Sequence, residues 1–182
     1  MTQRHDRQSR DQRYNGGARF FHWTIALLIT GMFASNWLRE AMERGSPERA
    51  WWLAAHMSLG ISIFILTLLR VLWRMTHRVP EPAPASPIVH AAAKLGHLAL
   101  YLFTLGLPVT GALRGMSGGG GLIFYGIPIP SLTGKDDALR ATIVPFHDGL
   151  IMYLLLALVA GHVLAALWHQ FVVRDGTLSR MV

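Results

Sequence analysis

Long apolar segments, separated by shorter polar stretches, recur four times along the chain. They cover residues 20–38, 51–69, 91–113 and 143–173. Each is about as long as the roughly 20 residues that an α-helix needs to cross about 30 Å of hydrocarbon. The pattern therefore predicts an all-α membrane protein built as a bundle of four transmembrane helices.

The polar stretches mark the ends of this predicted bundle. Residues 1–19 form an arm that is too long and too polar for the start of a cleaved signal peptide, so we interpret the first apolar segment as a retained span. Residues 20–173 then make up the transmembrane domain, and residues 174–182 a tail. The connection over residues 114–144 is the longest. Because about 30 residues is long for a structureless loop, we expect it to fold back over the outer mouth of the bundle.

Composition supports a membrane protein and restricts its metal chemistry. Only 15% of the residues are charged and 52% are hydrophobic, whereas about a quarter of the residues of a soluble domain are charged. The chain contains no cysteine, which excludes disulfides, thiolate metal sites, iron–sulfur clusters and covalent C-x-x-C-H haem attachment. Any bound metal must therefore be held by histidine, methionine or oxygen.

The formal net charge of +7 is distributed unevenly over the predicted topology. If the connections alternate between two sides, eleven of the 17 Lys and Arg residues lie on the side of the N-terminal arm and six on the other. Because Lys and Arg are enriched in cytoplasmic loops, both termini are predicted to be cytoplasmic. Topology and attraction to anionic lipid account for the basic excess. The charge therefore does not indicate nucleic-acid binding.

The nine histidines fall into two groups by position. Three lie in polar or linker sequence, where solvated or interfacial side chains are expected: His5, His77 and His90. An ionisable residue inside a span is costly and indicates a function by default. Six histidines lie within or at the edge of the apolar segments: His22, His56, His97, His147, His162 and His169.

Depth in the membrane pairs some of these six. In the predicted topology His56 and His147 lie near the outer face, and His22 and His97 towards the inner face. His162 follows His147 by 15 residues, which in one unbroken helix is roughly 22 Å deeper and about 60° around the axis. The arithmetic predicts an outer pair, His56 with His147, and an inner pair, His22 with His162, with His97 as a competitor.

Two imidazoles on facing helices can bind the iron of a haem from both sides. Small residues beside the histidines would admit the flat macrocycle, and Gly60, Gly96, Gly106, Ala160 and Gly161 are available. One alternative is that the histidines only form hydrogen bonds between helices. Another is a proton relay or metal transporter, which usually also has Asp or Glu deep in the spans. Here none of the four predicted spans has such a residue, because Asp148 is interfacial.

Seven stretches along most of the chain resemble the bacterial cytochrome b561 family of the inner membrane. That family includes superoxide oxidase, a superoxide:ubiquinone oxidoreductase. The stretches are "RFFHWTIALL", "AAHMSLGISIFILTLLRVLWR", "LGHLALYLFTLGLPVTG", "FYGIPIP", "FHDGL", "GHVLAALWHQF" and "RDGTLSRM". The resemblance implies four helices that hold two non-covalent b-type haems. Carried over by position, it implies His22 and His162 as ligands of the inner haem iron, and His56 and His147 as ligands of the outer haem iron.

The resemblance also implies roles near the two faces. His97 and His169 match histidines of the family that are not axial ligands, and with Arg70 and Arg74 they are expected to contact a quinone head group or haem propionates. Ubiquinone is then the expected electron acceptor. Arg114, Lys135 and Arg140 are the outer cations that would attract superoxide. One departure is that superoxide-oxidising relatives have a lysine just before the outer histidine of the last span, where this chain reads "IVPFH".

Three functions follow as hypotheses for a multi-pass protein of the bacterial inner membrane. The first is a di-haem cytochrome that oxidises superoxide outside and reduces ubiquinone inside. The second has the same haems but serves as the membrane electron-transfer subunit of a separate periplasmic redox protein. The third is a haem-free, histidine-lined transporter or sensor.

Overall fold

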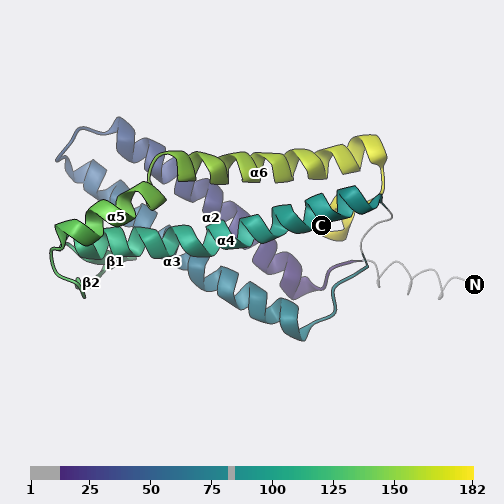
Figure 1. The fold of residues 1–182 in the computed structure, drawn as a ribbon, viewed down its shortest axis with the longest axis horizontal. Helices are drawn as coiled ribbons and strands as arrows, with labels where there is room; N and C mark the ends of the chain where they lie inside the picture. The colour runs from purple at the N-terminus through teal and green to yellow at the C-terminus, as the bar shows by residue number, and fades with distance from the viewer. Residues whose placement is uncertain (1–12, 82–84) are drawn as a thin grey trace, which may run out of the picture.

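The computed structural model describes residues 13–81 and 85–182, and in these residues the chain forms long helices and one small β-hairpin (Figure 1). The arginines Arg4, Arg7 and Arg10 of the N-terminal arm, and His5, lie outside the described residues. In chain order the elements are α2 (Gly16–Ala41), α3 (Pro47–Thr76), α4 (Pro87–Ser117), β1 (Leu122–Phe124), β2 (Ile127–Ile129), α5 (Asp137–His147), α6 (Leu150–Trp168), the π-helix η1 (His169–Val173) and the 3₁₀-helix η2 (Leu178–Arg180).

Local sequence signals explain where the first three helices begin. The side chain of Asn15 accepts a hydrogen bond from the backbone N–H of Ala18 at the start of α2. Ser46 and Ser86 cap α3 and α4 in the same way, and each is followed by a proline at the first helical position. A capping oxygen satisfies a free N–H of the first turn, and proline loses nothing there because that N–H has no partner in the helix. These helices therefore extend beyond the predicted apolar segments at both ends.

Three helical stretches are long and apolar enough to cross a membrane among the described residues: Pro47–Thr76, Pro87–Ser117 and Asp137–Val173. The first predicted span, in α2, is not one of the three. Its 26 residues would suffice in length, but polar side chains such as His22, Thr30 and Asn36 lower its hydropathy. The helical membrane architecture is confirmed, and the fourth span stays a prediction.

The last predicted segment, residues 143–173, is not one continuous helix. It is interrupted after His147, because Asp148 is extended (φ −96°, ψ 171°) and Gly149 has φ 65° and ψ −128°. Glycine is the residue that adopts such positive φ values without steric cost. His147 therefore ends α5 while His162 lies in α6, and the rotation of about 60° that an unbroken helix would give does not apply.

The long connection contains a hairpin that an all-α prediction omits. Strand β1 pairs antiparallel with β2, with Phe124 opposite Ile127. Tyr125 and Gly126 form the turn, both with positive φ (47° and 86°), as a two-residue type I′ turn requires. The Ser58 hydroxyl of α3 donates to the Ile123 carbonyl (3.2 Å) and accepts from the Tyr125 N–H (2.9 Å). The connection thus folds back onto α3, as expected.

A narrow apolar core joins the helices, and most large apolar side chains face outward. The buried residues include Ile29, Phe33 and Ile63, while Leu27, Leu102 and Leu164 are between 63% and 73% exposed. Contiguous exposed apolar surface of this extent suits hydrocarbon as the surrounding solvent.

Both ends of the described chain meet at one end of the bundle, on the right in Figure 1. The Tyr14 N–H donates to the Arg180 carbonyl (3.0 Å), and the Trp23 indole N–H donates to the Met181 carbonyl (2.8 Å). Arg19 binds the Val182 carbonyl (2.7 Å). The tail therefore lies across the start of α2.

Candidate functional site

At the end of the bundle that carries the hairpin, two histidines face each other from α3 and α5. The ring centroids of His56 and His147 are 6.2 Å apart. The Nδ1 atom of His147 lies 2.9 Å from the Leu107 carbonyl, and that of His56 lies 3.4 Å from the Met32 carbonyl. A backbone carbonyl that holds Nδ1–H fixes the ring and leaves Nε2 as the metal-binding nitrogen, which is the usual arrangement at metal sites.

Gly111 of α4 is part of this outer site, although the sequence pattern did not indicate it. A Cβ placed on Gly111 would lie 2.6 Å from Cε1 of His147. The imidazole therefore packs directly on the helix backbone. Glycine is common in apolar helices, and nothing in the sequence around Gly111 indicates that it packs against a histidine. Only the fold shows this contact.

At the opposite end, three histidines from three helices lie together. The ring centroids of His22 (α2) and His162 (α6) are 6.1 Å apart, and those of His97 (α4) and His162 are 5.6 Å apart. The Nδ1 atom of His22 is buried without a hydrogen-bond partner in the described residues. The structure brings together all three histidines predicted for the inner site, and it places His162 between the two competitors.

These distances fit a haem iron held from both sides. A metal–nitrogen bond of about 2 Å on each side puts the centroids of two opposed imidazoles about 6 Å apart, close to both pairs. A Cβ on Gly60, Gly96, Gly106 or Gly161 would meet no atom within 4 Å. In the described residues, no three His, Asp or Glu side chains form a group that could hold a bare metal ion. The donor set suits a macrocycle with two axial ligands.

The three predicted outer cations lie near the hairpin end, but two of them have carboxylate partners. Arg114 pairs with Asp148 (3.1 Å) and Lys135 with Asp137 (3.4 Å). Arg140 donates to the Arg114 carbonyl (3.0 Å). These contacts reduce the positive charge available to an incoming anion.

A fourth outer cation, Arg39 at the end of α2, was not singled out from the sequence. Its charge and that of Arg114 act on both His56 and His147. The Arg39 side chain is only 16% exposed and pairs with Glu40 (2.6 Å), and its Nε atom is buried without a hydrogen-bond partner in the described residues. A charged residue at the end of a span usually only helps to set the orientation in the membrane. The sequence therefore offered no reason to choose Arg39 as a site residue.

At the inner end, Arg70 and Arg74 of α3 flank the histidine cluster. The charge of Arg70 acts on His22, His97 and His162, and that of Arg74 on His97. These two arginines and the three histidines therefore form one neighbourhood, as predicted from their depth.

His169 lies in the π-helix η1, where its Nδ1 atom contacts Oδ2 of Asp175 at 2.5 Å. Burial raises the pKa of the Asp175 carboxyl, but hydrogen bonds from Thr177 and His169 outweigh this and lower that pKa from 3.8 to about 2. The carboxylate is thus ionised at neutral pH and holds the ring of His169. Asp175 was not identified from the sequence, because it follows the span in a polar tail.

Comparisons with known proteins cover nearly the whole chain. A family described as prokaryotic cytochrome b561 matches residues 13–182. Cytochrome b561 homolog 2 of Escherichia coli (strain K12) is 32% identical over 177 residues, which span 94% of this chain and 92% of that protein. The probable superoxide oxidase CybB of Yersinia pestis is 31% identical over 164 residues, 88% and 90% of the two chains. Cytochrome b562 of Cereibacter sphaeroides is 31% identical over 165 residues, 88% and 89%.

Proposed function

The chain belongs to the prokaryotic cytochrome b561 family, whose members are b-haem electron-transfer cytochromes of the membrane, and from this premise we propose that it oxidises superoxide at the outer face and reduces ubiquinone at the inner face. Two b-type haems, when bound, supply one-electron carriers at two depths between these faces. The chain's own residues hold the haems, attract the donor and bind the acceptor.

The two histidine pairs at opposite ends of the bundle carry this proposal. His56 and His147 would hold the outer haem, with their Nδ1 atoms on backbone carbonyls and their Nε2 atoms free. His22 and His162, 6.1 Å apart, would hold the inner haem. His97 is the competing ligand.

The reaction balances with a bound quinone and protons from the inner side. Two superoxide anions each lose one electron and leave as dioxygen, while one ubiquinone takes up two electrons and two protons. His56 and His147 would both hold the outer haem, which would supply electron transfer without a binding position for superoxide. Arg114, Lys135 and Arg140, together with Arg39, would attract the anion.

Residues at the inner end would bind the quinone head group and orient it. Arg70 and Arg74 supply positive charge beside the histidine cluster, and His97 and His169 supply nitrogen atoms for hydrogen bonds. The Asp175 carboxylate holds Nδ1 of His169, so Nε2 would face the acceptor. Arg70 and Arg74 are also suitable partners for haem propionates.

The proposed orientation follows from the charge distribution. Residues 1–19 would form a cytoplasmic arm, residues 20–173 the domain in the bacterial inner membrane, and residues 174–182 a cytoplasmic tail. The contact between the Tyr14 N–H and the Arg180 carbonyl supports termini on one side. The excess of Lys and Arg on that side supports the cytoplasm as its location.

Optical spectra of purified single-ligand variants test the haem assignment. We expect His56→Ala and His147→Ala each to remove one of two b-type absorbance components, with the other retained. At the inner end, His22→Ala should remove the second component, whereas His97→Ala should keep both and slow quinone reduction. Loss of both components in every variant would contradict separate sites, and loss of a component in His97→Ala would reassign the inner ligand.

Stopped-flow mixing of superoxide with the oxidised protein tests the donor. Haem reduction should be faster than the spontaneous dismutation of superoxide, and it should slow at high ionic strength because steering by surface charge is screened. Reduction no faster than dismutation would exclude superoxide oxidation.

A second function is favoured by the surface of the outer end. The hairpin exposes Tyr125 and Ile127 (both 63%), and Leu132 beyond it is 80% exposed. Apolar side chains on an outer loop suit contact with a protein partner. In this alternative the chain is the membrane electron-transfer subunit of a periplasmic redox protein, and it would show haem reduction by that partner but not by superoxide.

A further inference from the structure

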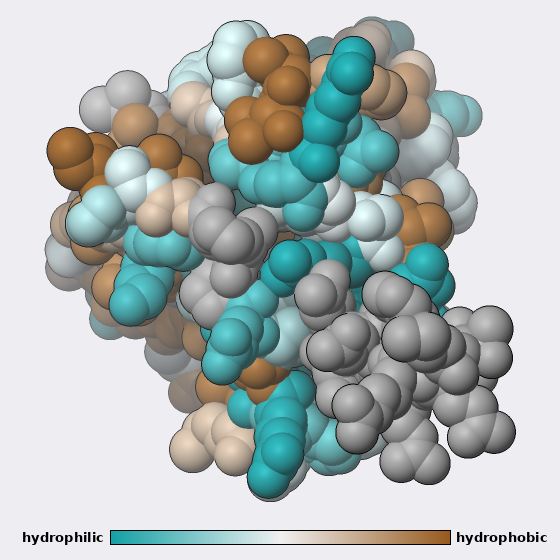
Figure 2. All heavy atoms as spheres, turned by 90° about the vertical axis from the view of Figure 1, so that its right-hand side faces the viewer, coloured by the Kyte–Doolittle hydropathy of each residue, from teal (hydrophilic) through white to brown (hydrophobic). Residues whose placement is uncertain are grey.

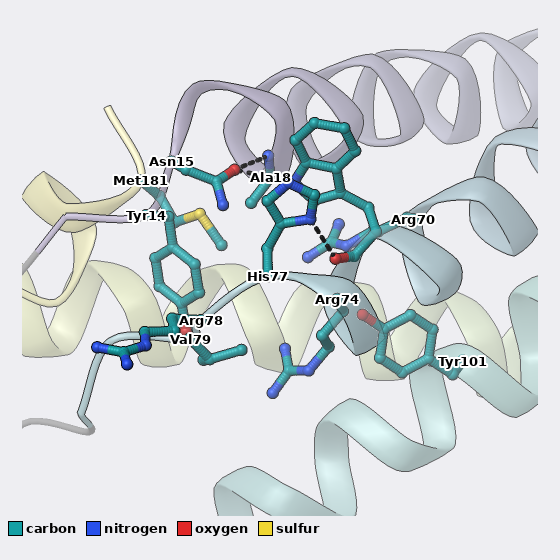
Figure 3. Close-up of a pocket in the computed structure, with 11 residues that line it drawn as sticks. Tyr14, Asn15, Ala18, Arg70, Arg74, His77, Arg78, Val79, Tyr101 and Met181 are labelled. Atoms are coloured by element: carbon teal, nitrogen blue, oxygen red, sulfur yellow. Dashed lines mark hydrogen bonds between the residues drawn. The ribbon is translucent and has the colours of Figure 1, made fainter.

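The end of the bundle that carries the chain termini contains a pocket lined by arginines (Figure 3). Arg70 and Arg74 come from the last turns of α3, and Arg78 follows the helix. Their spacing of four residues places the two helical arginines on one face of α3. In the described part of the chain, none of the three lies within ion-pair distance of a carboxylate. The pocket therefore carries uncompensated positive charge.

Hydroxyl and aromatic groups complete the lining of this pocket. The Tyr101 hydroxyl is buried, and the described residues give it no hydrogen-bond partner, while the Arg70 guanidinium lies 5.9 Å from the centre of its ring. Tyr14 lines the same pocket near Arg78. Guanidinium and phenol groups together offer several hydrogen-bond donors to one oxyanion.

A stacked aromatic pair makes one wall rigid. The rings of Trp73 and His77 are 3.8 Å apart and nearly parallel, at 8°. The Trp73 indole N–H also donates to Asn15 at the start of α2 (2.9 Å). These two contacts fix the Trp73 ring at the edge of the pocket and tie the end of α3 to the start of α2.

An apolar side chain, Val79, lines the pocket just beyond α3 and is 40% exposed. Leu72 (58%) and Met75 (78%) are exposed on the opposite side of the same helix. Figure 2, a view onto this end of the molecule, shows hydrophilic and hydrophobic residues side by side there. A ligand with a phosphate head and acyl chains would match both kinds of surface, and basic pockets at the ends of membrane helices bind such head groups.

We propose that this pocket binds the phosphate group of an anionic phospholipid, with Arg78, which has no part in the proposed electron transfer, as its principal cation. Arg74 borders both this site and the proposed acceptor site, and the role of Arg78 does not depend on which donor or acceptor the cytochrome uses. The acyl chains of the lipid leave the pocket past Val79, and the lipid links the end of α3 to the start of α2.

Charge-removing variants in nanodiscs test this site on the haem-loaded protein. The test variant is Arg78→Gln, since Arg78 is exposed and lies beyond the helix. The matched control is Lys94→Gln, an exposed cation of α4 that does not line the pocket. Thermal unfolding is compared in phosphatidylcholine with and without phosphatidylglycerol. We expect phosphatidylglycerol to raise the Tm of the wild type and of Lys94→Gln, and Arg78→Gln to lose about half or more of that rise.

Native mass spectrometry and a phosphate titration separate the lipid from a free anion. Wild type and Lys94→Gln should retain a phosphatidylglycerol adduct after detergent extraction that Arg78→Gln loses. Equal Tm rises and equal adducts in Arg78→Gln and Lys94→Gln would overturn the proposal. Stabilisation of the detergent-solubilised protein by inorganic phosphate, without any effect of phosphatidylglycerol, would overturn the lipid as the source of the phosphate.

Discussion

Backbone carbonyls orient the imidazoles of the outer site. The Leu107 carbonyl lies 2.9 Å from Nδ1 of His147, and the Met32 carbonyl 3.4 Å from Nδ1 of His56. Both acceptors are backbone atoms of neighbouring helices, so helix packing itself directs the rings. A ligand oriented in this way needs little reorganisation to bind a metal.

A methyl group at Gly111 should disturb this arrangement. In Gly111→Ala the new Cβ would lie 2.6 Å from Cε1 of His147, so the ring must move. The affinity for the outer haem should fall by about 10–100-fold, as is typical of disrupted outer-shell contacts, and less outer haem should be retained on purification. Gly31→Ala in α2 is the control, because its Cβ would meet only Cδ1 of Leu59, at an ordinary contact distance of 3.6 Å. Equal haem content in both variants would show that the ring is free to shift.

The sequence predicted which histidines lie together better than it predicted their surroundings. Histidine in an apolar segment is conspicuous because it is costly there, and depth alone placed His56 with His147 and His22 near His162. The roles of Gly111, Arg39 and Asp175 were not identified. Either they arise from contacts between segments that are distant in the sequence, or the residue type is common at its position. Such contacts follow only from the packed fold.

At the scale of elements, capping residues and prolines account for the helix starts, and the interruption between α5 and α6 accounts for the main error. Apolar periodicity continues through residues 143–173, so hydropathy alone predicts one helix. Gly149, with φ 65°, is the local signal of the break. A single glycine in an apolar segment is too common to be decisive.

Replacing Gly149 should strain the connection between α5 and α6. Gly149→Ala is expected to destabilise the protein by about 1–3 kcal/mol, because an alanine does not adopt φ 65° with ψ −128° without strain. Gly31→Ala, within α2 and with its Cβ in ordinary contact with Leu59 (3.6 Å), should leave stability unchanged or raise it by up to about 1 kcal/mol. Thermal unfolding measures both. A Gly149→Ala variant as stable as the wild type would mean that the break relaxes at no cost.

The C-terminal tail should detach in acid. The pKa of Asp175 is lowered to about 2 in the folded protein, so its stabilising contribution is complete above the ordinary value of 3.8 and is lost as the pH falls through about 2. Hydrogen exchange of residues 176–182, corrected for the intrinsic rate at each pH, should show protection at pH 5 that decreases towards pH 2. Asp175→Asn should lack this pH dependence, and a tail that loses protection equally in both proteins would exclude Asp175 as the cause.

At the scale of the whole molecule, the tail packs against the start of α2, and the excess of Lys and Arg at this end predicts that it is cytoplasmic. Fusion of a fluorescent protein that matures only in the cytoplasm to the C-terminus should therefore give fluorescent cells. Fusion of a periplasm-dependent phosphatase at the same point should be inactive. A phosphatase fused after Gly126 of the hairpin is the control and should be active. The reverse result would invert the orientation and exchange the donor and acceptor ends.

The overall architecture was predictable because few kinds of backbone structure can cross a bilayer. Backbone groups in hydrocarbon must be paired within a helix or a closed barrel, so long apolar segments specify helices and short loops specify their order. The hairpin in the outer connection was not predicted as strands, although the connection was expected to fold back. Its strands have three residues each, and their apolar residues resemble those of the neighbouring spans.

The interruption at Asp148 and Gly149 also lets the histidines at one end of the molecule keep their orientation when the chain length at the other end changes. In a continuous helix, inserting or deleting one residue between two ligands turns one against the other by about 100°. Here two non-helical residues can absorb such a change. The outer loops of this cytochrome can therefore gain or lose residues in evolution, or accept a grafted sequence, while His162 keeps its place against α2 and α4.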